Sequence, residues 1–207
     1  VLDGPIGRDL LYGTEKYWLK GLAYYDAGAR SFYTKEKKIN SPEDLDGLKI
    51  RVMESKTAFD MVKALGGSPT PISFGELYTS LQQGVVDGAE NNPPSFYLSR
   101  HYEVCKYYTL DEHTILPDVL LMSTHIWDSF SDKERGWLSQ AVKESITEQR
   151  KLWTKSEKQS LDAVKEAGVE IIIPDKTLFS EKSKKILESY KEDEVLYDFI
   201  NRIKNTK

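Results

Sequence analysis

The stretch from Ser131 to Ala167 restricts the fold of this chain more than any other, because it contains no proline and only one glycine, Gly136. Ser131 and Glu134 form a capping-box pattern at its start, and Gly168 follows its end. The stretch is therefore predicted to be one helix of about 35 residues, about 50 Å long at 1.5 Å per residue. A helix of that length exceeds the width of a small domain, so we expect it to cross two lobes.

The remainder of the chain alternates short helices with short apolar strands. Capping patterns, prolines at first helical positions and terminal glycines indicate helices at 5–20, 41–47, 55–67, 73–84 and 93–102, with two more within 175–207. Strand-like runs lie at 22–28, 48–53, 68–72, 85–91, 104–110, 117–123 and 169–174. Such alternation predicts an α/β fold with a mostly parallel sheet covered by helices.

Composition excludes several classes of function. The chain has 207 residues, 39% of them hydrophobic, and a net charge of −4 with Lys and Glu interspersed, which argues against nucleic-acid and polybasic membrane surfaces. The single cysteine, Cys105, rules out an internal disulfide. No run of about 18 apolar residues is present. The start, "VLDGPIGRDLL", has no initiating Met and no signal peptide, so we expect a processed or cut chain.

The motifs of most enzymes and metal sites are absent. Three histidines, His101, His113 and His125, lie twelve residues apart, without paired cysteines or a carboxylate at helical spacing to complete a zinc site. No phosphate-binding glycine loop and no G-x-S-x-G sequence occurs. An enzyme that works through a pair of carboxylates stays as a remote alternative, since the chain has 33 acidic residues, although abundant acids usually form a solvated surface.

Two arginines lie next to predicted strand ends, where ligands bind in parallel sheets. Arg51 alternates with Ile50 and Val52 in "LKIRVM", and Arg30 follows an apolar run in "GARSFY". Each is either a surface charge or a ligand contact, and the local pattern leaves both open. Two guanidinium groups near one another would favour a carboxylate ligand, which arginine holds by paired hydrogen bonds that lysine cannot reproduce.

The stretch "QQGVVDGAENNPP" is unusual for a surface loop. Asn91 and Asn92 are either simple turn residues before the prolines or amides held in place by them, able to donate to a carboxylate and accept from a hydroxyl. Phe74 is likewise either a core residue or an apolar wall beside a ligand.

Three longer motifs carry a resemblance to a known family: "GLKIRVMES", "ALGGSPTPISFGELYTSLQQGVVDGAENNPPSFY" and "HYEVCKYYTLDEH". In their order, spacing and residue identities they closely resemble the substrate-binding proteins of tripartite ATP-independent periplasmic (TRAP) transporters, the dicarboxylate-binding-protein family. The resemblance extends from "VLDGPIG" to "GVEIIIPDK". The resemblance implies an extracytoplasmic, periplasmic binding protein of two α/β lobes. Its members close over a small organic acid and deliver it to a membrane permease, and they are not enzymes and need no cofactor.

The resemblance also assigns ligand-binding residues. The principal carboxylate-binding arginine is matched by Arg51, and a second arginine used by many members by Arg30. The aromatic residue of the family's site is matched by Phe74 and its ligand-contacting asparagine by Asn91.

Three further positions lie near the ligand in some relatives and are matched here by Glu90, His113 and the more variable Asp118. The residues of "TPISFGELY" and "DEHTILPDVLLMS" resemble those of family members that bind hexuronates such as glucuronate and galacturonate, so a hexuronate is the favoured ligand. Four-carbon dicarboxylates and sialic acids use the same arginine and remain alternatives.

Family members are longer, so the resemblance implies a fragment that lacks the N-terminal third and most of one lobe. The arginine-bearing lobe is expected at 28–116 and 158–176, parts of the other lobe with the long helix at 1–27 and 117–157, and C-terminal helices at 177–207. Unpaired strand edges would then be exposed, which predicts dimerisation or strand exchange and weakened binding.

Overall fold

A computed structural model describes residues 1–206, which divide into two compact units. Unit 1 consists of Val1–Ala27, Leu116–Lys155 and the segment from Lys191 onward, and unit 2 of Gly28–Ile115 and Ser156–Tyr190. Both combine helices with strands, and the α/β class expected from the sequence is confirmed.

Unit 2 is built on a six-stranded sheet of order β4-β3-β5-β2-β6-β8. The strands are β2 (Ala29–Thr34), β3 (Lys49–Val52), β4 (Ser68–Pro71), β5 (Gly88–Asn91), β6 (Tyr107–Ile115) and β8 (Glu170–Ile172). The pairs β3–β4, β3–β5 and β6–β8 are parallel, whereas β2 is antiparallel to both of its neighbours, β5 and β6. The mostly parallel sheet is thus confirmed, with one reversed strand.

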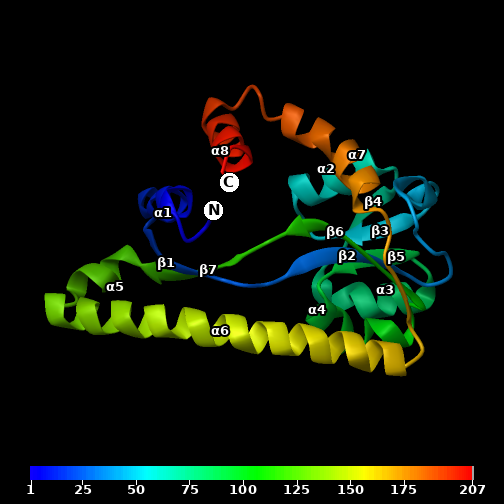
Figure 1. Ribbon diagram of the computed structural model, residues 1–207, viewed down its shortest axis with the longest axis horizontal. Coiled ribbons are helices and arrows are strands. Elements are labelled where there is room, and N and C mark those ends of the chain that lie inside the picture. The colour runs from blue at the N-terminus through cyan, green and yellow to red at the C-terminus, as the bar shows by residue number, and fades with distance from the viewer. Residues whose placement is uncertain (207) are drawn as a thin grey trace. The chain divides into compact units, whose positions relative to one another are not determined.

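Helices cover both faces of this sheet, and the central strands β3, β5 and β2 are mostly buried (Figure 1). The covering elements are η2 (Pro42–Leu45), α2 (Lys56–Leu65), η3 (Phe74–Glu76), α3 (Leu77–Gln83), α4 (Pro93–Leu98), η4 (His101–Glu103) and α7 (Lys176–Glu188). Neighbouring residues of β2 point to opposite cores: Phe32 packs with α2 and α7, and Tyr33 with α3 and α4. Side chains on both faces of β2 are therefore packed in a hydrophobic core.

Local signals explain where these helices begin and end. Ser55 accepts a hydrogen bond from the Ala58 N–H at the start of α2, and Gly66 ends that helix in the left-handed conformation, at φ 106°. Asn92 caps α4 by accepting from the Ser95 N–H, and prolines occupy the first two positions of the helix. The interpretation that the prolines start a helix is confirmed.

Unit 1 contains a two-stranded antiparallel sheet of β1 (Leu19–Tyr25) and β7 (Asp118–Ser123). Its helices include α1 (Pro5–Tyr12), η1 (Glu15–Tyr17), α5 (Thr124–Ser129) and α8 (Glu194–Lys204). The single helix predicted for 5–20 is wrong beyond Tyr12. Gly13 follows α1, the Thr14 hydroxyl bonds the Leu11 carbonyl, and Trp18 adopts a left-handed conformation that turns the chain into β1.

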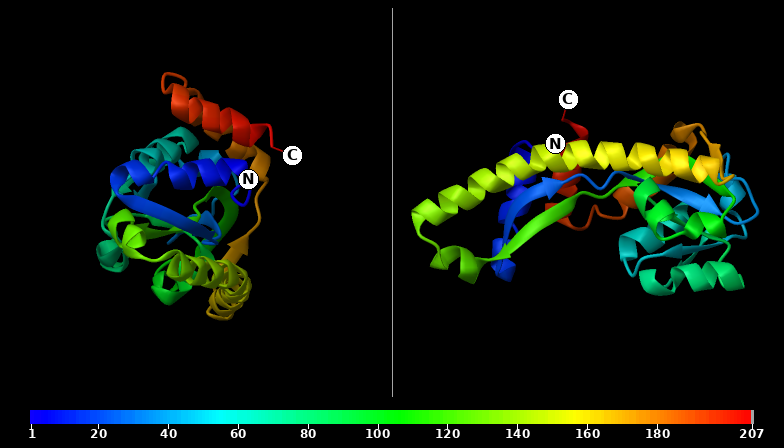
Figure 2. Two further views of the ribbon diagram at one scale, coloured as in Figure 1. Left: turned by 90° about the vertical axis from the view of Figure 1, so that its left-hand side faces the viewer. Right: turned by 90° about the horizontal axis from the view of Figure 1, so that it is seen from below.

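The long helix predicted from the proline-free stretch is confirmed as α6 (Asp132–Glu166), which is uninterrupted along its length (Figure 2). At its start Glu134 accepts from the Ser131 N–H at 2.8 Å while its own N–H donates to the Ser131 hydroxyl at 3.4 Å. Its residues up to Lys155 belong to unit 1, and those that follow belong to unit 2, where Val164 is buried in the core.

The C-terminal segment forms the two expected helices, but these helices do not form a separate structural unit. Helix α7 belongs to unit 2, where Phe179 is buried against the residues of α2. Helix α8 belongs to unit 1, where Arg202 forms an ion pair with Asp9 at 2.5 Å. Apolar periodicity located both helices, but tertiary packing assigned them to different units.

Candidate functional site

Polar side chains gather at one edge of the sheet in unit 2. Arg51 lies at the carboxyl end of β3, and Glu90 and Asn91 lie at the carboxyl end of β5. Arg30 comes from the opposite end of its own strand, near the start of β2. Because β2 runs antiparallel to β5 and pairs Ser31 with Asn91, its first residues reach the same edge as the ends of the parallel strands.

Arg51 is buried but leaves most of its hydrogen-bonding capacity unused. Its side chain is on the opposite face of β3 from Ile50 and Val52, and the residue is 3% exposed. The Nε–H donates to the Ile72 carbonyl at 2.8 Å, and the guanidinium carbon lies 5.7 Å from the centre of the Phe74 ring. Within residues 1–206 neither terminal nitrogen of Arg51 makes a hydrogen bond. Burial lowers the pKa of this guanidinium, although an arginine remains charged at neutral pH.

A neutral histidine supports the Arg51 side of the site. His101 is 1% exposed, and its Nδ1 lies 2.9 Å from the hydroxyl of Tyr33, which is fully buried. Its ring meets the Phe74 ring edge to face, with centres 5.7 Å apart. Burial and the charge of Arg51 lower the pKa of His101 to about 4. His101 is therefore uncharged at neutral pH and adds no second positive charge beside Arg51.

Arg30 is also buried, but its guanidinium is almost fully engaged. Its Nε and Nη2 donate to the two carboxylate oxygens of Glu90 at 2.5 and 2.8 Å, and Nη2 also donates to the Glu90 carbonyl at 2.9 Å. Its Nη1 donates to Asn91 Oδ1 at 2.9 Å. Four of the five N–H groups of an arginine are thus used. Burial lowers the pKa of Arg30, but Glu90 outweighs it and raises the pKa overall.

A second charged pair continues this network on the far side of Glu90. The Nδ1 of His113 lies 2.6 Å from Asp111 Oδ2, and its Nε2 lies 3.6 Å from Glu90 Oε2, too far for a hydrogen bond but close enough for an ion pair. Burial opposes protonation of His113, yet Asp111 and Glu90 outweigh it and raise its pKa to about 9. Burial likewise raises the pKa of Glu90, while His113 and Arg30 lower it overall.

The network is therefore neutral as a whole, with Arg30 and His113 balancing Glu90 and Asp111. A buried charge is tolerated in proteins when it is paired and hydrogen-bonded in this way.

The side-chain oxygen of Asn91 accepts two hydrogen bonds, one from Arg30 Nη1 and one from the Asn92 N–H, both at 2.9 Å. An amide oxygen has two lone pairs, so its accepting capacity is used. The amide nitrogen of Asn91 has no hydrogen-bond partner in the described part of the chain. The expectation of an amide that both donates to and accepts from a ligand is therefore corrected for Asn91, which has only N–H donors left for a ligand.

The remaining candidates divide between the two units. Phe74 begins η3 beside Arg51 and is 46% exposed, which fits a wall of a site better than a core position. Asp118 begins β7 of unit 1, where it pairs with Tyr25 in the ladder and is exposed. Arg30, Arg51, Phe74, Glu90, Asn91 and His113 all belong to unit 2.

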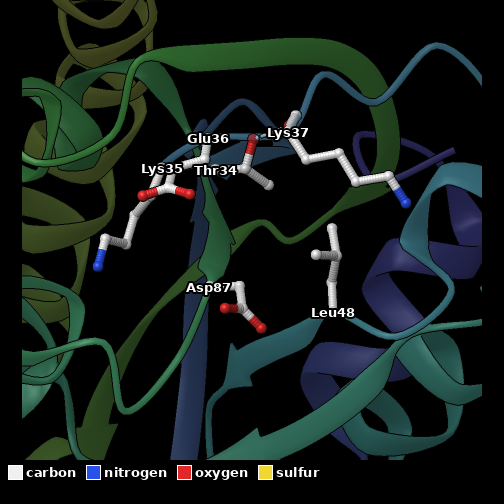
Figure 3. Close-up of a pocket in the computed structure, with 6 residues that line it drawn as sticks. All are labelled: Thr34, Lys35, Glu36, Lys37, Leu48 and Asp87. Carbon is white, nitrogen blue, oxygen red and sulfur yellow. Dashed lines mark hydrogen bonds between the residues drawn. The ribbon is translucent and has the colours of Figure 1, made fainter.

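Two surface hollows in unit 2 lie apart from Arg51. One, of about 200 Å³, is lined by Thr34, Lys35, Glu36, Lys37, Leu48 and Asp87 at the end of β2 opposite Arg30 (Figure 3). Asp87 there accepts from the Lys49 N–H, and Lys35 and Lys37 extend to opposite sides. The other, of about 160 Å³, lies over Asp111 and His113 beside α7.

Residues 1–206 contain no group of histidine, cysteine or acidic side chains placed to hold a metal ion. Among the helices of that same range, none combines the length and the apolar character that crossing a membrane requires.

Sequence reasoning missed three residues of this site. Asp111 lies two positions before His113, so strand alternation would have placed both on one face. Tyr33 and His101 are far apart in the sequence, and no spacing pattern connects them. His101 was considered only as a metal ligand.

Comparison with known proteins gives a consistent result. Residues 1–193 match the model of the bacterial extracellular solute-binding protein family 7. A curated solute-binding protein of Chromohalobacter salexigens is 38% identical over 191 residues, which are 92% of this chain and 57% of that protein. The chain thus spans less than two thirds of the length of this relative.

Solved structures extend the similarity to the whole chain. A TRAP periplasmic solute-binding protein of Bradyrhizobium in complex with galacturonate is 44% identical, with a TM-score of 0.93 over 100% of this chain and 69% of that one. A second, from Chromohalobacter salexigens with bound D-glucuronate, is 36% identical, with a TM-score of 0.97 and the same coverage. The resemblance to the TRAP substrate-binding proteins and the two-lobed α/β fold that it implies are confirmed.

Proposed function

Because this chain belongs to the bacterial extracellular solute-binding proteins of family 7, we propose that it captures a small organic acid, with a hexuronate favoured, for a TRAP transporter. The proposal assigns the carboxylate of the acid to Arg51. It has the Asn91 amide bind a neighbouring oxygen of the ligand, and it has Phe74 form an apolar wall of the site.

The observation that carries this proposal is the unused hydrogen-bonding capacity of Arg51. The residue is 3% exposed, its Nε is anchored on Ile72, and both terminal nitrogens lack partners in the described residues. A buried guanidinium in that state is stabilised by an anion, and a carboxylate fits its two parallel donors. Charge-assisted hydrogen bonds of this kind contribute about 1.5 to 3 kcal/mol each.

The hexuronate preference rests on the ligands named for the two solved relatives. Four-carbon dicarboxylates and sialic acids also carry a carboxylate for Arg51, so they are the alternatives. These acids differ in the hydroxyl and second carboxylate groups that they present beyond the first carboxylate. Discrimination among them therefore depends on contacts other than Arg51.

The remaining parts of the proposal follow from the family. The chain would act outside the cytoplasm and pass its ligand to the permease subunits of the transporter, without changing the ligand chemically. Asp118 of unit 1 remains a candidate contact. Self-association, expected from exposed strand edges, remains a prediction.

A thermal-shift panel of hexuronates, four-carbon dicarboxylates and sialate tests the proposal. Ligand at about a thousand times its dissociation constant adds about 4 kcal/mol of stability, so binding gives a clear shift. We expect the largest shift with galacturonate or glucuronate, and its loss in Arg51→Ala. Arg100→Ala is the matched control, because Arg100 is an exposed arginine of the same unit.

Two results would contradict the proposal. One is a panel in which no acid stabilises the chain, and the other is a hexuronate shift that Arg51→Ala leaves intact. Chromatography of the recovered acid completes the test, since conversion to a product would favour the remote enzyme alternative.

A further inference from the structure

We propose that Gln149 of the long helix α6 is a positioning residue for the chain where it leaves unit 1. Its side-chain amide holds the backbone of Asp26, so that β1 and α6 move as one body as far as Asp26. Bending of this connection is then confined to the next two residues, Ala27 and Gly28. This role concerns backbone motion alone and is independent of which ligand binds.

Gln149 makes two hydrogen bonds to one backbone residue. The Asp26 N–H donates to Gln149 Oε1 at 2.9 Å, and Gln149 Nε2 donates to the Asp26 carbonyl at 2.7 Å. Two residues that face each other in an antiparallel sheet exchange the same pair of bonds. Strand β1 ends at Tyr25, which pairs with Asp118, the first residue of β7. The amide of Gln149 therefore continues the hydrogen bonding of the strand by one residue, where the ladder with β7 has ended.

The chemistry of glutamine suits it to this position. Its side chain ends in one carbonyl oxygen and one NH2 group, so it can accept from a backbone N–H and donate to a backbone carbonyl at the same time. A glutamate there would have no N–H to donate, and a methionine of similar length would make neither bond. The two partners also fix the orientation of the amide, since a reversed amide would face donor with donor and acceptor with acceptor.

Two further polar contacts of α6 lie beside this one. The Tyr25 hydroxyl is 2.8 Å from Ser145 Oγ, which itself donates to a carbonyl of α6, so the tyrosine is the donor. Ser145 lies one turn before Gln149 on the same face of the helix. Arg150 donates to both carboxylate oxygens of Asp3, at 2.7 and 3.0 Å. Three neighbouring points thus fix the end of β1 and the first residues of the chain to α6.

These polar contacts, more than apolar burial, set the position of α6 in unit 1. Among the residues of α6 that belong to this unit, 132–155, Val142 is the only buried one. Apolar packing is non-directional, whereas a hydrogen bond requires a narrow range of distances and angles. The place of Asp26 along α6 therefore depends on Gln149.

The other end of the connection is fixed in unit 2. Strand β2 begins at Ala29, in the ladder with β6. Only Ala27 and Gly28 lie between this strand and Asp26. Gly28 has a φ of 68°, in the region that glycine enters at little cost. When two units move, a few residues at the ends of elements absorb the change in φ and ψ. The connection is thus a joint of two residues, and one of its fixed ends depends on Gln149.

Amide hydrogen exchange of the whole chain, resolved by residue, tests the clamp without any ligand. Gln149→Met keeps the length of the side chain and removes both hydrogen bonds. We expect the Asp26 N–H to exchange about tenfold faster in this variant, as the loss of one hydrogen bond predicts. The Thr124 N–H, which donates to the Trp18 carbonyl elsewhere in unit 1, should keep its rate. A general loss of stability would accelerate both amides.

Two variants accompany this measurement. Gln140→Met is the matched control, because Gln140 lies in the same helix and donates to Glu144 of that helix, and it should leave both exchange rates unchanged. Gln149→Glu keeps an oxygen that accepts from the Asp26 N–H but loses the donor to the Asp26 carbonyl. The exchange rate of the Asp26 N–H in this variant should lie between those of the wild type and Gln149→Met.

Backbone nitrogen-15 relaxation locates the joint. In the wild type we expect lower order parameters at Ala27 and Gly28 than at Tyr25 and Asp26, and in Gln149→Met the value at Asp26 should fall to that of Gly28.

Three results would overturn the proposal. They are an Asp26 exchange rate that Gln149→Met leaves unchanged, equal acceleration at Asp26 and Thr124, and order parameters at Ala27 and Gly28 as high as at Tyr25. None of these measurements needs a ligand, so they decide the role of Gln149 even if no acid binds and the proposed function fails.

Discussion

The end of strand β3 and the start of strand β2 each carry a buried arginine, yet the two residues are in opposite states. Arg51 has one hydrogen bond, to a backbone carbonyl, and Arg30 has four, three of them to Glu90. The difference shows that burial of an arginine does not by itself indicate a ligand site. What matters is how many of its N–H groups the protein has already used.

The largest expected effect concerns stability and separates the two arginines directly. Arg30→Met should lower the free energy of unfolding by about 3 to 5 kcal/mol, because it leaves the buried carboxylate of Glu90 without its main partner. Arg51→Met should lower it by about 1 kcal/mol or less, since only the bond to Ile72 is lost. Urea denaturation measures both. Equal losses of stability in the two variants would contradict the distinction between Arg30, whose N–H groups are mostly bonded within the protein, and Arg51, whose terminal N–H groups are not.

The next effect is a pH dependence of stability on the Arg30 side. The pKa of His113 is raised from 6.5 to about 9. The contribution of protonated His113 to the free energy of unfolding is therefore complete below pH 6.5 and is lost as the pH rises through 9. A rise of this size corresponds to about 3 kcal/mol. The free energy of unfolding should fall over this pH window, and His113→Gln should remove most of the fall.

His125→Gln, a change at an exposed histidine of α5 in unit 1, is the matched control and should keep the wild-type slope. If His113→Gln and the wild type lost stability in parallel between pH 6.5 and 9, the charged state of His113 in the folded protein would be wrong.

The smallest effect concerns the support behind Arg51. Tyr33→Phe should lower the free energy of unfolding by about 1 kcal/mol, because it removes the hydroxyl that pairs with His101 Nδ1. Tyr97→Phe is the control, since Tyr97 is only partly buried and its hydroxyl has no hydrogen bond among residues 1–206, so a change below about 0.5 kcal/mol is expected. A Tyr33→Phe loss no larger than that of the control would show that this hydrogen bond does not stabilise the Arg51 side.

Part of this site could be predicted from the sequence because its signals are local. Strand alternation set Arg51 apart from Ile50 and Val52, and the prolines after Asn92 predicted the start of α4. The residues themselves raised Arg30, Phe74 and Asn91 as candidates with both readings open. The family resemblance gave these three ligand-binding roles and added Glu90, His113 and Asp118. None of these signals could say which donors and acceptors were still available, because that depends on partners elsewhere in the chain.

The sequence by itself determined the elements whose causes lie within a few residues. Proline-free length and a capping box were sufficient for α6, and terminal glycines and N-caps were sufficient for the helices of unit 2. One error, the helix predicted for 5–20, arose where Gly13 and Trp18 redirect the chain despite a favourable apolar spacing. Another was the strand β2 at Ala29–Thr34, which no predicted strand covered.

Only the tertiary structure decided the division of labour between the arginines. The reversed direction of β2 brings Arg30 to the edge of Glu90 and Asn91, which lie about sixty residues later in the chain. Hydrogen bonds between side chains of different strands exist only once the sheet has assembled. These hydrogen bonds engage the guanidinium of Arg30 and leave the terminal nitrogens of Arg51 without partners among the described residues. The pattern therefore follows from strand order and direction rather than from any local motif.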